Sequence, residues 1–411
     1  MSRGARRARC EAGGALLLCA ATLGALLAAG PARAQQQDDL YGGERDTTRR
    51  PSRREKPVEV YVAPALPWRG PLPDLVLQIT ATCELSGEPV SEPAWADNER
   101  LVVAAEDPEN QTYRLSLCRL GSRRPDWSVP LPAAPSGAPA ADAERAYVGL
   151  RNGEIRAYSL EAGEEAWRSG PAAAPPETLA RLDSGLAVGS SAGFTLLDST
   201  TGALRFTADM GSPVLTSPVG CAGRWVFALG SGQVRALDPK NGRLLWKREV
   251  RGVPGPPSCD GGSRVIVGTS ARQLVALSAR SGHRAWRQKL GGAVRVPPVV
   301  HGGGVYAGAM DGRMYGLKER NGHRMWSLPV GERVRRAPVL VRGVLAVASA
   351  GDTRLSLIHL PTGSPLLEAE APPETAGWVG APVADGDRLA LSADRRMGPD
   401  GMVIVYKVVE R

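Results

Sequence analysis

The chain has 411 residues, of which 43% are hydrophobic and 23% are charged, and its 51 lysines and arginines exceed its 42 aspartates and glutamates. The first 34 residues hold five of the arginines and one glutamate, so the formal charge falls from +9 to +5 without them. An excess of this size is not the electrostatic footprint of a nucleic-acid-binding protein. We therefore expect no nucleic-acid partner.

Residues 1–34 have the three parts of a secretory signal peptide. Four arginines lie between Arg3 and Arg9, an apolar run extends from Ala12 to Ala29, and Ala32-Arg33-Ala34 has the small-x-small pattern of a cleavage site. These features predict export to the periplasm with cleavage after Ala34. The alternative is a membrane anchor, but Gly30-Pro31 directly after an Ala-rich and Gly-rich run favours cleavage. No transmembrane segment would then remain.

A lipid anchor is a separate question, raised by Cys19 inside the apolar run. The bulky Leu18 before it disfavours lipidation, and both a lipidated and a soluble form stay open.

Residues 35–70, which follow the signal peptide, are rich in charge and proline and poor in residues that could fill a core, most clearly in Arg49–Pro57. This composition predicts a disordered linker. The alternative is that its basic run contacts anionic lipid, cell-wall polymer or an acidic partner.

From there the chain repeats one pattern with a period of 39 to 41 residues. The marker of each repeat is an aromatic or apolar residue near its end, at Trp127, Trp167, Phe206, Trp246, Trp286, Trp326 and Leu367. A fixed period of this size predicts a repeat architecture.

Each repeat contains four short apolar runs separated by turn signals. In the clearest repeat the runs are Val294–Val300, Val305–Ala309, Met314–Leu317 and Met325–Trp326. Asp311-Gly312 and Asn321-Gly322 are pairs that close tight hairpins. Four antiparallel strands in about 40 residues are typical of one blade of a β-propeller.

The tail decides the number of blades. Seven markers give seven blades, and Gly380–Val383, Arg388–Ser392 and Met402–Val408 supply three further strands. The run Leu72–Ile79 has no blade of its own. We expect it to complete the last blade, which gives an all-β, eight-bladed propeller over residues 71–411. Seven blades with decorating terminal strands are the alternative.

The frame Ala-x-Asp-x-x-(Thr/Asn)-Gly-x-x-x-Trp resembles the repeat of the quinoprotein-like, or PQQ-like, propeller family. In that family the tryptophan packs on the alanine and the glycine turn and docks neighbouring blades. The resemblance implies this structural role for Trp127, Trp167, Phe206, Trp246, Trp286, Trp326, Ala157, Ala236, Ala276, Gly163, Gly202, Gly242, Gly282, Gly322 and Gly363. Phe206, Leu367, Leu196 and Gly316 depart from the pattern, and we expect looser joints there.

Two functions compete within this family. Its dehydrogenases resemble one another in binding pyrroloquinoline quinone and calcium, with an adjacent cysteine pair and long inserted loops. Here none of the cysteines is adjacent to another and the repeats are of almost minimal length. The alternative class, similar to the BamB-like propellers of outer-membrane protein assembly, is a non-enzymatic scaffold. We therefore expect a monomeric ring that binds protein partners in the cell envelope, with no catalytic residue, cofactor or metal.

The four cysteines after the signal peptide form two candidate pairs. Cys221 and Cys259 occupy nearly the same phase of neighbouring repeats, and Cys83 and Cys118 lie on the closing strand and the first blade. An exported chain permits disulfides, so we expect each pair to be able to bridge adjacent blades. Free buried thiols are the alternative.

One basic cluster is a candidate partner surface. Arg333, Arg335, Arg336 and Arg342 lie in the seventh repeat and could form a positive patch for an acidic partner. The alternative is a solvated face.

Overall fold

The computed structural model describes residues 70–411 apart from 171–173, 183–184, 349–352 and 399. The chain divides into two units, Met1–Lys56 and Pro57–Arg411, and all described residues belong to the second. The signal peptide expected at 1–34 and the linker expected at 35–70, apart from Gly70, lie outside the described residues. Within the described part the regular elements are strands, and none is an apolar helix of membrane-spanning length.

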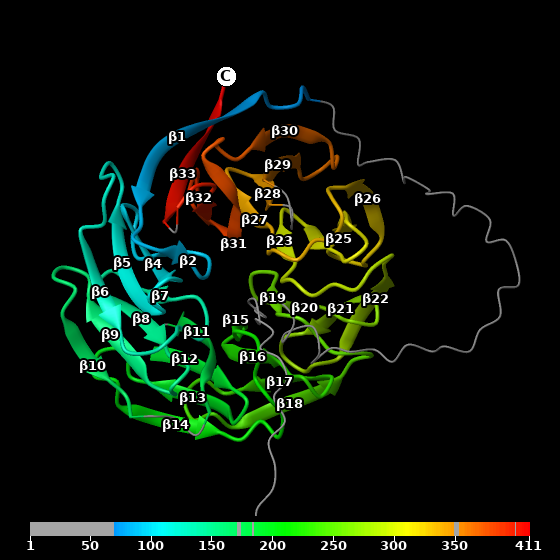
Figure 1. Cartoon of the computed structure of the whole chain (residues 1–411). Coiled ribbons are helices and arrows are strands. Elements are labelled where there is room, and N and C mark those ends of the chain that lie inside the picture. Colours follow the sequence, from blue (N-terminus) through cyan, green and yellow to red (C-terminus); the bar gives the residue numbers. More distant parts are fainter. Residues whose placement is uncertain (1–69, 171–173, 183–184, 349–352, 399) are drawn as a thin grey trace, which may run out of the picture. The chain divides into compact units, whose positions relative to one another are not determined.

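The strands form eight antiparallel sheets that follow one another around a ring, which confirms the eight-bladed propeller (Figure 1). We number the sheets as blades 1 to 8 in chain order. Blade 1 contains β2 (Glu88–Pro89), β3 (Ala94–Trp95), β4 (Arg100–Asp107), β5 (Thr112–Arg119) and β6 (Trp127–Leu131). Blade 2 contains β7 (Ala140–Ala141), β8 (Arg145–Gly149), β9 (Ile155–Ser159) and β10 (Glu165–Arg168). Blade 3 contains β11 (Pro176–Leu182), β12 (Gly185–Ser190), β13 (Gly193–Leu197) and β14 (Leu204–Ala208).

Blades 4, 5 and 6 follow in chain order. Blade 4 contains β15 (Val219–Cys221), β16 (Arg224–Ala228), β17 (Gln233–Leu237) and β18 (Leu244–Glu249). Blade 5 contains β19 (Ser258–Cys259), β20 (Arg264–Gly268), β21 (Gln273–Ser278) and β22 (Arg284–Lys289). Blade 6 contains β23 (Val299–His301), β24 (Gly304–Gly308), β25 (Arg313–Lys318) and β26 (Arg324–Pro329). Its first strand is shorter than the predicted run because Pro297 and Pro298 have no N–H to donate.

The last two blades close the ring. Blade 7 contains β27 (Val339–Val341), β28 (Val344–Ala348), β29 (Arg354–His359) and β30 (Pro365–Glu370). Blade 8 contains β31 (Thr375–Asp385), β32 (Arg388–Arg395) and β33 (Gly401–Glu410) from the end of the chain and β1 (Leu75–Glu84) from its beginning.

The core lies between the blades rather than inside any one of them. The second and third strands of a blade are buried on both faces, as in Val265–Val267 of β20, and read as continuous apolar runs. The fourth strand alternates, with Trp286 of β22 buried between exposed neighbours. Each blade therefore presents apolar side chains to the blade on either side, and the ring is stabilised by burial at its joints.

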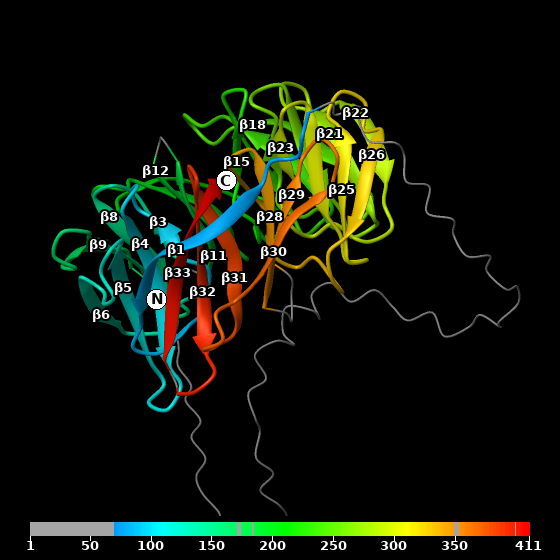
Figure 2. The same ribbon diagram turned by 90° about the horizontal axis from the view of Figure 1, so that it is seen from above.

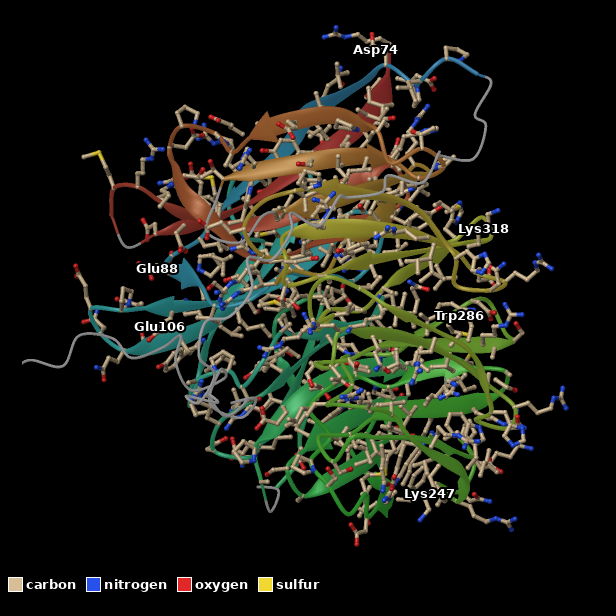
Figure 3. All side chains as sticks on the ribbon, turned by 90° about the vertical axis from the view of Figure 1, so that its right-hand side faces the viewer. Asp74, Glu88, Glu106, Lys247, Trp286 and Lys318 are labelled. Carbon is tan, nitrogen blue, oxygen red and sulfur yellow. A yellow bond between two sulfur atoms is a disulfide. The ribbon has the colours of Figure 1, made fainter. Side chains whose placement is uncertain are left out.

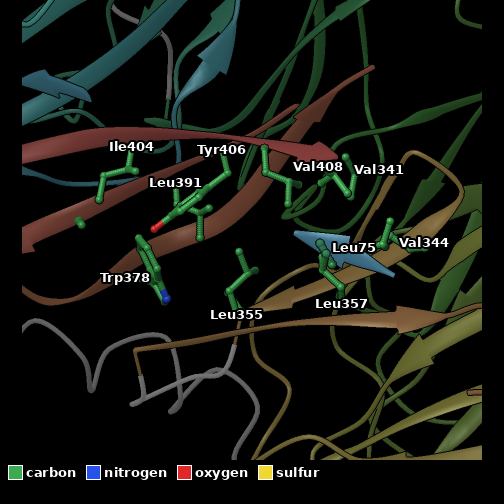
Figure 4. Packing of buried hydrophobic residues seen from close by; sticks show 14 of the residues in the cluster. Leu75, Val341, Val344, Leu355, Leu357, Trp378, Leu391, Ile404, Tyr406 and Val408 are labelled. Atoms are coloured by element: carbon green, nitrogen blue, oxygen red, sulfur yellow. The ribbon is translucent and has the colours of Figure 1, made fainter. Parts of the chain in front are cut away.

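The predicted closure by the N-terminal strand is confirmed. Strand β1 pairs antiparallel with β33 from Leu75 opposite Glu410 to Glu84 opposite Met402, and Figure 2 shows the two strands lying side by side. The strand begins three residues later than predicted and continues five residues further. Its first residue, Leu75, joins Leu357 of blade 7 and Val408 of blade 8 in one buried cluster (Figure 4).

Candidate functional site

Each joint between neighbouring blades is built around one aromatic side chain. Trp286 of blade 5 lies against the turn glycine Gly322 of blade 6, where an added Cβ would lie 2.5 Å from Trp286 Cε3. Its indole Nε1 donates a hydrogen bond to the carbonyl oxygen of Glu319 in the same turn, at 2.7 Å. The ring thus fills the joint while its polar atom is satisfied by the next blade.

The same contact recurs around the ring, with 32 to 34 residues between the tryptophan and its carbonyl acceptor. At four further joints the indole Nε1 donates a hydrogen bond to a backbone carbonyl oxygen of the next blade, at 2.8 to 3.0 Å. The donor and acceptor pairs are Trp127 and Leu160, Trp167 and Ser199, Trp246 and Ala279, and Trp326 and Leu360. The facing glycines are Gly163, Gly202, Gly282 and Gly363, whose φ angles of 69° to 71° favour glycine. In every case the glycine belongs to the repeat after the tryptophan, so the motif spans two blades.

In blades 2, 4, 5 and 6 a small residue lies beneath the tryptophan ring, whereas Leu117 takes this place beneath Trp127 in blade 1. Ala276 is the cross-strand partner of Trp286, and Ala157 and Ala236 pair with Trp167 and Trp246 in the same way. Gly316 takes this place under Trp326, where an added Cβ would lie 2.2 Å from the ring. Trp326 is only 3% exposed, against 8% for Trp286, so the expected loosening at Gly316 is wrong: the missing Cβ lets the ring sit deeper.

The two repeat markers that are not tryptophan, Phe206 and Leu367, differ from each other. Phe206, opposite Leu196, still packs on the turn of Gly242, and it stacks on Trp225 with ring centroids 6.1 Å apart. It has no N–H to donate to the next blade. Leu367 is half-buried and pairs with Leu357 within blade 7.

Two tryptophans outside the repeat frame serve the remaining joints, and the sequence interpretation missed both. Trp378 of β31 donates from Nε1 to the carbonyl oxygen of Thr353 in blade 7, at 2.8 Å. Trp95 of blade 1 donates to the carbonyl oxygen of Val383 in blade 8, at 3.4 Å. The signal in the sequence is that each of these tryptophans lies near a joint at which the repeated pattern has no tryptophan in the marker position.

Both cysteine pairs form disulfides in the structure. Cys83 of β1 is bonded to Cys118 of β5, so this bond links blade 8 to blade 1 where the two chain ends meet. Cys221 of β15 is bonded to Cys259 of β19, which links the inner strands of blades 4 and 5.

The four arginines of the seventh repeat differ in their surroundings. Arg336 is half-buried and donates to the carbonyl oxygen of Trp378, and burial lowers the pKa of its guanidinium. Arg342 pairs with Glu410 at 3.7 Å, whereas Arg333 and Arg335 are exposed. Arg336 therefore belongs to the joint between blades 7 and 8 more than to a surface patch.

The one described cluster of metal-ligating side chains does not supply the ligands of a calcium ion, the metal bound by the family's dehydrogenases. Within the described residues, one group of three acidic or sulfur side chains has its donor atoms within 4.8 Å of one another: Cys221, Cys259 and Asp260. Its two sulfurs are consumed by the disulfide, which leaves a single carboxylate. Calcium takes six to eight oxygen ligands.

A groove of about 800 Å³ lies along β1 at the closure of the ring. Its charges largely neutralise one another, since Glu84 pairs with Arg123 at 2.9 Å and with Arg395 at 3.0 Å. Ile79, 52% exposed, adds an apolar side chain to its wall.

A second groove, of about 590 Å³, lies between the outer strand of blade 4 and the sheet of blade 5. Val275 and Leu277 of β21 form an apolar floor. Its polar wall is basic, and we call it the basic groove; the basic residues are Arg248, Arg251, His283, Arg284 and Arg287.

Comparison with known proteins agrees with this architecture. The family model described as outer membrane protein assembly factor BamB matches residues 151–255 and 230–399, together more than half of the chain. No curated protein matches the chain in sequence.

Solved structures match over most of the chain, at identities that show the fold alone. The crystal structure of BamB from Moraxella catarrhalis has a TM-score of 0.66 and 17% identity, covering 81% of this chain and 100% of that one. The computationally designed Ika8 protein has a TM-score of 0.67 and 15% identity, covering 80% and 99%. The quinohemoprotein alcohol dehydrogenase ADHIIG from Pseudomonas putida HK5 has a TM-score of 0.62 and 12% identity, covering 80% and 76%. By its sequence match and its docked, repeated blades, the chain belongs to the PQQ-like β-propeller family whose model is described as outer membrane protein assembly factor BamB.

Proposed function

We propose that this protein is a non-enzymatic scaffold of the periplasm that holds protein partners during outer-membrane protein assembly. The observation that carries the proposal is the match to the assembly-factor model over residues 151–399, which includes six of the seven repeat markers and the blades between them. The disulfides at two joints agree with an oxidising compartment outside the cytosol.

The chemistry of the repeated docking positions supports a scaffold as well. The indole N–H groups of the docking tryptophans are engaged by backbone carbonyl oxygens of neighbouring blades, as Trp246 is by Ala279. They are therefore structural groups rather than ligand contacts. Arg333 and Arg335 remain exposed in the seventh repeat and could contribute to a partner surface.

The second candidate is a quinone-dependent and calcium-dependent dehydrogenase of alcohols or sugars. It is favoured by the fold shared with the Pseudomonas putida alcohol dehydrogenase. It is disfavoured by the residues, because the four described cysteines are paired between blades, and the one cluster of metal-ligating type among the described residues keeps a single carboxylate.

The proposal is tested by deleting the gene in the source organism and measuring the amount of folded outer-membrane barrel proteins by their heat-modifiable migration. Loss of folded barrels, restored by the full chain but not by a chain starting at Gln35 without the signal peptide, is the expected result. Unchanged barrel levels in the deletion strain would contradict a role in assembly.

A further inference from the structure

Charge is distributed unevenly between the blades. Blades 4 to 6, residues 219–330, contain 18 lysines and arginines but only five aspartates and glutamates. Residues 71–218, which include blades 1 to 3, contain 11 and 20, and residues 331–411 contain 10 of each. In Figure 3, Lys247 and Lys318 lie on the opposite side of the propeller from Glu88 and Glu106. The modest net charge of the chain therefore conceals one strongly basic sector.

The basic groove lies within this sector and its charges are not neutralised internally. Within the described part of the chain, no ion pair or hydrogen bond engages the guanidinium groups of Arg251, Arg284 or Arg287, all three of which are exposed. Arg248 is oriented by a hydrogen bond from its Nε to the carbonyl oxygen of Gly282, at 2.8 Å. One carboxylate, that of Glu249, lines the same groove. The groove at the ring closure differs, because there Glu84 pairs with two arginines.

The blade framework does not require basic residues at these positions. His283 and Arg284 directly follow the docking glycine Gly282, and the equivalent positions of blade 2, after Gly163, are Glu164 and Glu165. The same turn thus folds with opposite charge on another blade. The positive charge of the groove is a property of blades 4 and 5 and not a consequence of docking.

We propose that the basic groove binds an extended, carboxylate-rich segment of a partner protein. The proposal rests on the scaffold function and specifies the chemistry of one partner. Guanidinium groups bind carboxylates through paired, charge-assisted hydrogen bonds, and the apolar floor accepts the aliphatic parts of the segment. A concave groove of about 590 Å³ admits the side chains of a few residues, whereas a flat membrane surface cannot follow it.

The test uses the full chain after signal removal and a fluorescein-labelled peptide of ten glutamates, with binding measured by fluorescence anisotropy. We expect binding at low salt that weakens at least tenfold as salt rises to about 0.3 M, because exposed charge pairs are screened. Arg284→Glu with Arg287→Glu should weaken binding at least tenfold. The matched control, Lys240→Glu with Lys289→Glu, makes the same change in net charge at exposed residues of blades 4 and 5 outside the groove lining and should change affinity less than threefold.

Equal weakening in the two double variants would show that the peptide responds to net charge and not to the groove, and would overturn the proposal. Binding to phosphatidylglycerol vesicles or inorganic phosphate without binding to the peptide would overturn it too. Arg284→Gln with Arg287→Gln, checked by its melting temperature, provides a second variant if the charge reversal does not fold. A failed peptide test combined with loss of folded barrels in the deletion strain would leave the scaffold function standing and remove only this site.

Discussion

The docking contact predicts that Gly322→Ala is far more costly than an alanine at a geometrically equivalent open turn. Gly322 and Gly303 lie in the same blade and both have φ of 74°. An added Cβ at Gly322 would lie 2.5 Å from the Trp286 ring, whereas one at Gly303 would have nothing within 4 Å. The left-handed backbone costs alanine about 1 kcal/mol at either position. Overpacking against the indole adds about 2 kcal/mol at Gly322 alone.

These energies convert to about 2 °C of melting temperature for Gly303→Ala and about 6 °C for Gly322→Ala, at roughly 2 °C per kcal/mol for a large domain. Differential scanning calorimetry measures both. In a Trp286→Ala background, Gly322→Ala should cost no more than Gly303→Ala, which gives a coupling free energy of about 2 kcal/mol between the two residues. Equal losses for the two glycine variants, or no coupling to Trp286, would refute the docking role.

Three further predictions concern the closure and the pH dependence of stability. Removing the Cys83–Cys118 disulfide by Cys83→Ala and Cys118→Ala should cost about 4 kcal/mol from loop entropy and more through opening of the ring. Removing Cys221–Cys259, of similar loop length, is its control, and an equal or larger loss there would contradict the closure role. Trp378→Phe keeps an aromatic side chain but removes the indole N–H that donates to the Thr353 carbonyl oxygen, which then accepts only from the Ala371 backbone N–H. Thermal melting should fall by the equivalent of about 1 kcal/mol, and an unchanged melt would exclude the indole hydrogen bond as a stabilising contact. Burial, with the charge of Glu88, raises the pKa of Asp394 from 3.8 to about 6, so the folded state loses stability as pH rises through 6. Asp394→Asn should therefore raise the melting temperature at pH 8 by the equivalent of about 1 kcal/mol and should have almost no effect at pH 4. The expected gain is smaller than the full rise in pKa would give, because Asp394 is partly exposed to solvent. An equal effect at both pH values would rule out this ionisation.

The repeat made the architecture predictable because its signals are local. A turn glycine needs a positive φ, and a tryptophan at a fixed offset marks the outer strand, so Gly282 and Trp286 can be placed from one stretch of sequence. Counting the markers and the strands left over at the two ends was enough to predict that β1 completes blade 8. The tryptophan and glycine that form the docking contact both belong to the repeated pattern. Only the structure shows that the glycine facing each tryptophan comes from the next blade.

The parts that escaped prediction depend on contacts between segments far apart in the sequence. Trp378 and Trp95 acquire a role only when the ring closes and brings blades 7, 8 and 1 together. The basic groove combines the end of β18 with side chains of β21 and β22, and Arg251, Arg284 and Arg287, each taken alone, occupy ordinary exposed positions. Arg336 shows the converse, because a residue expected on the surface is half-buried against Trp378.

The most direct test of the central claim, that this propeller is a scaffold and not an enzyme, is a quinone-binding measurement. The purified chain after signal removal is incubated with pyrroloquinoline quinone and calcium, separated from free ligand, and examined by absorption spectroscopy, thermal melting and dye reduction with alcohols and aldoses. The scaffold predicts no retained chromophore, an unmoved melting temperature and no dye reduction. A retained chromophore with a shifted melt and substrate-dependent dye reduction would contradict it and make the protein a dehydrogenase.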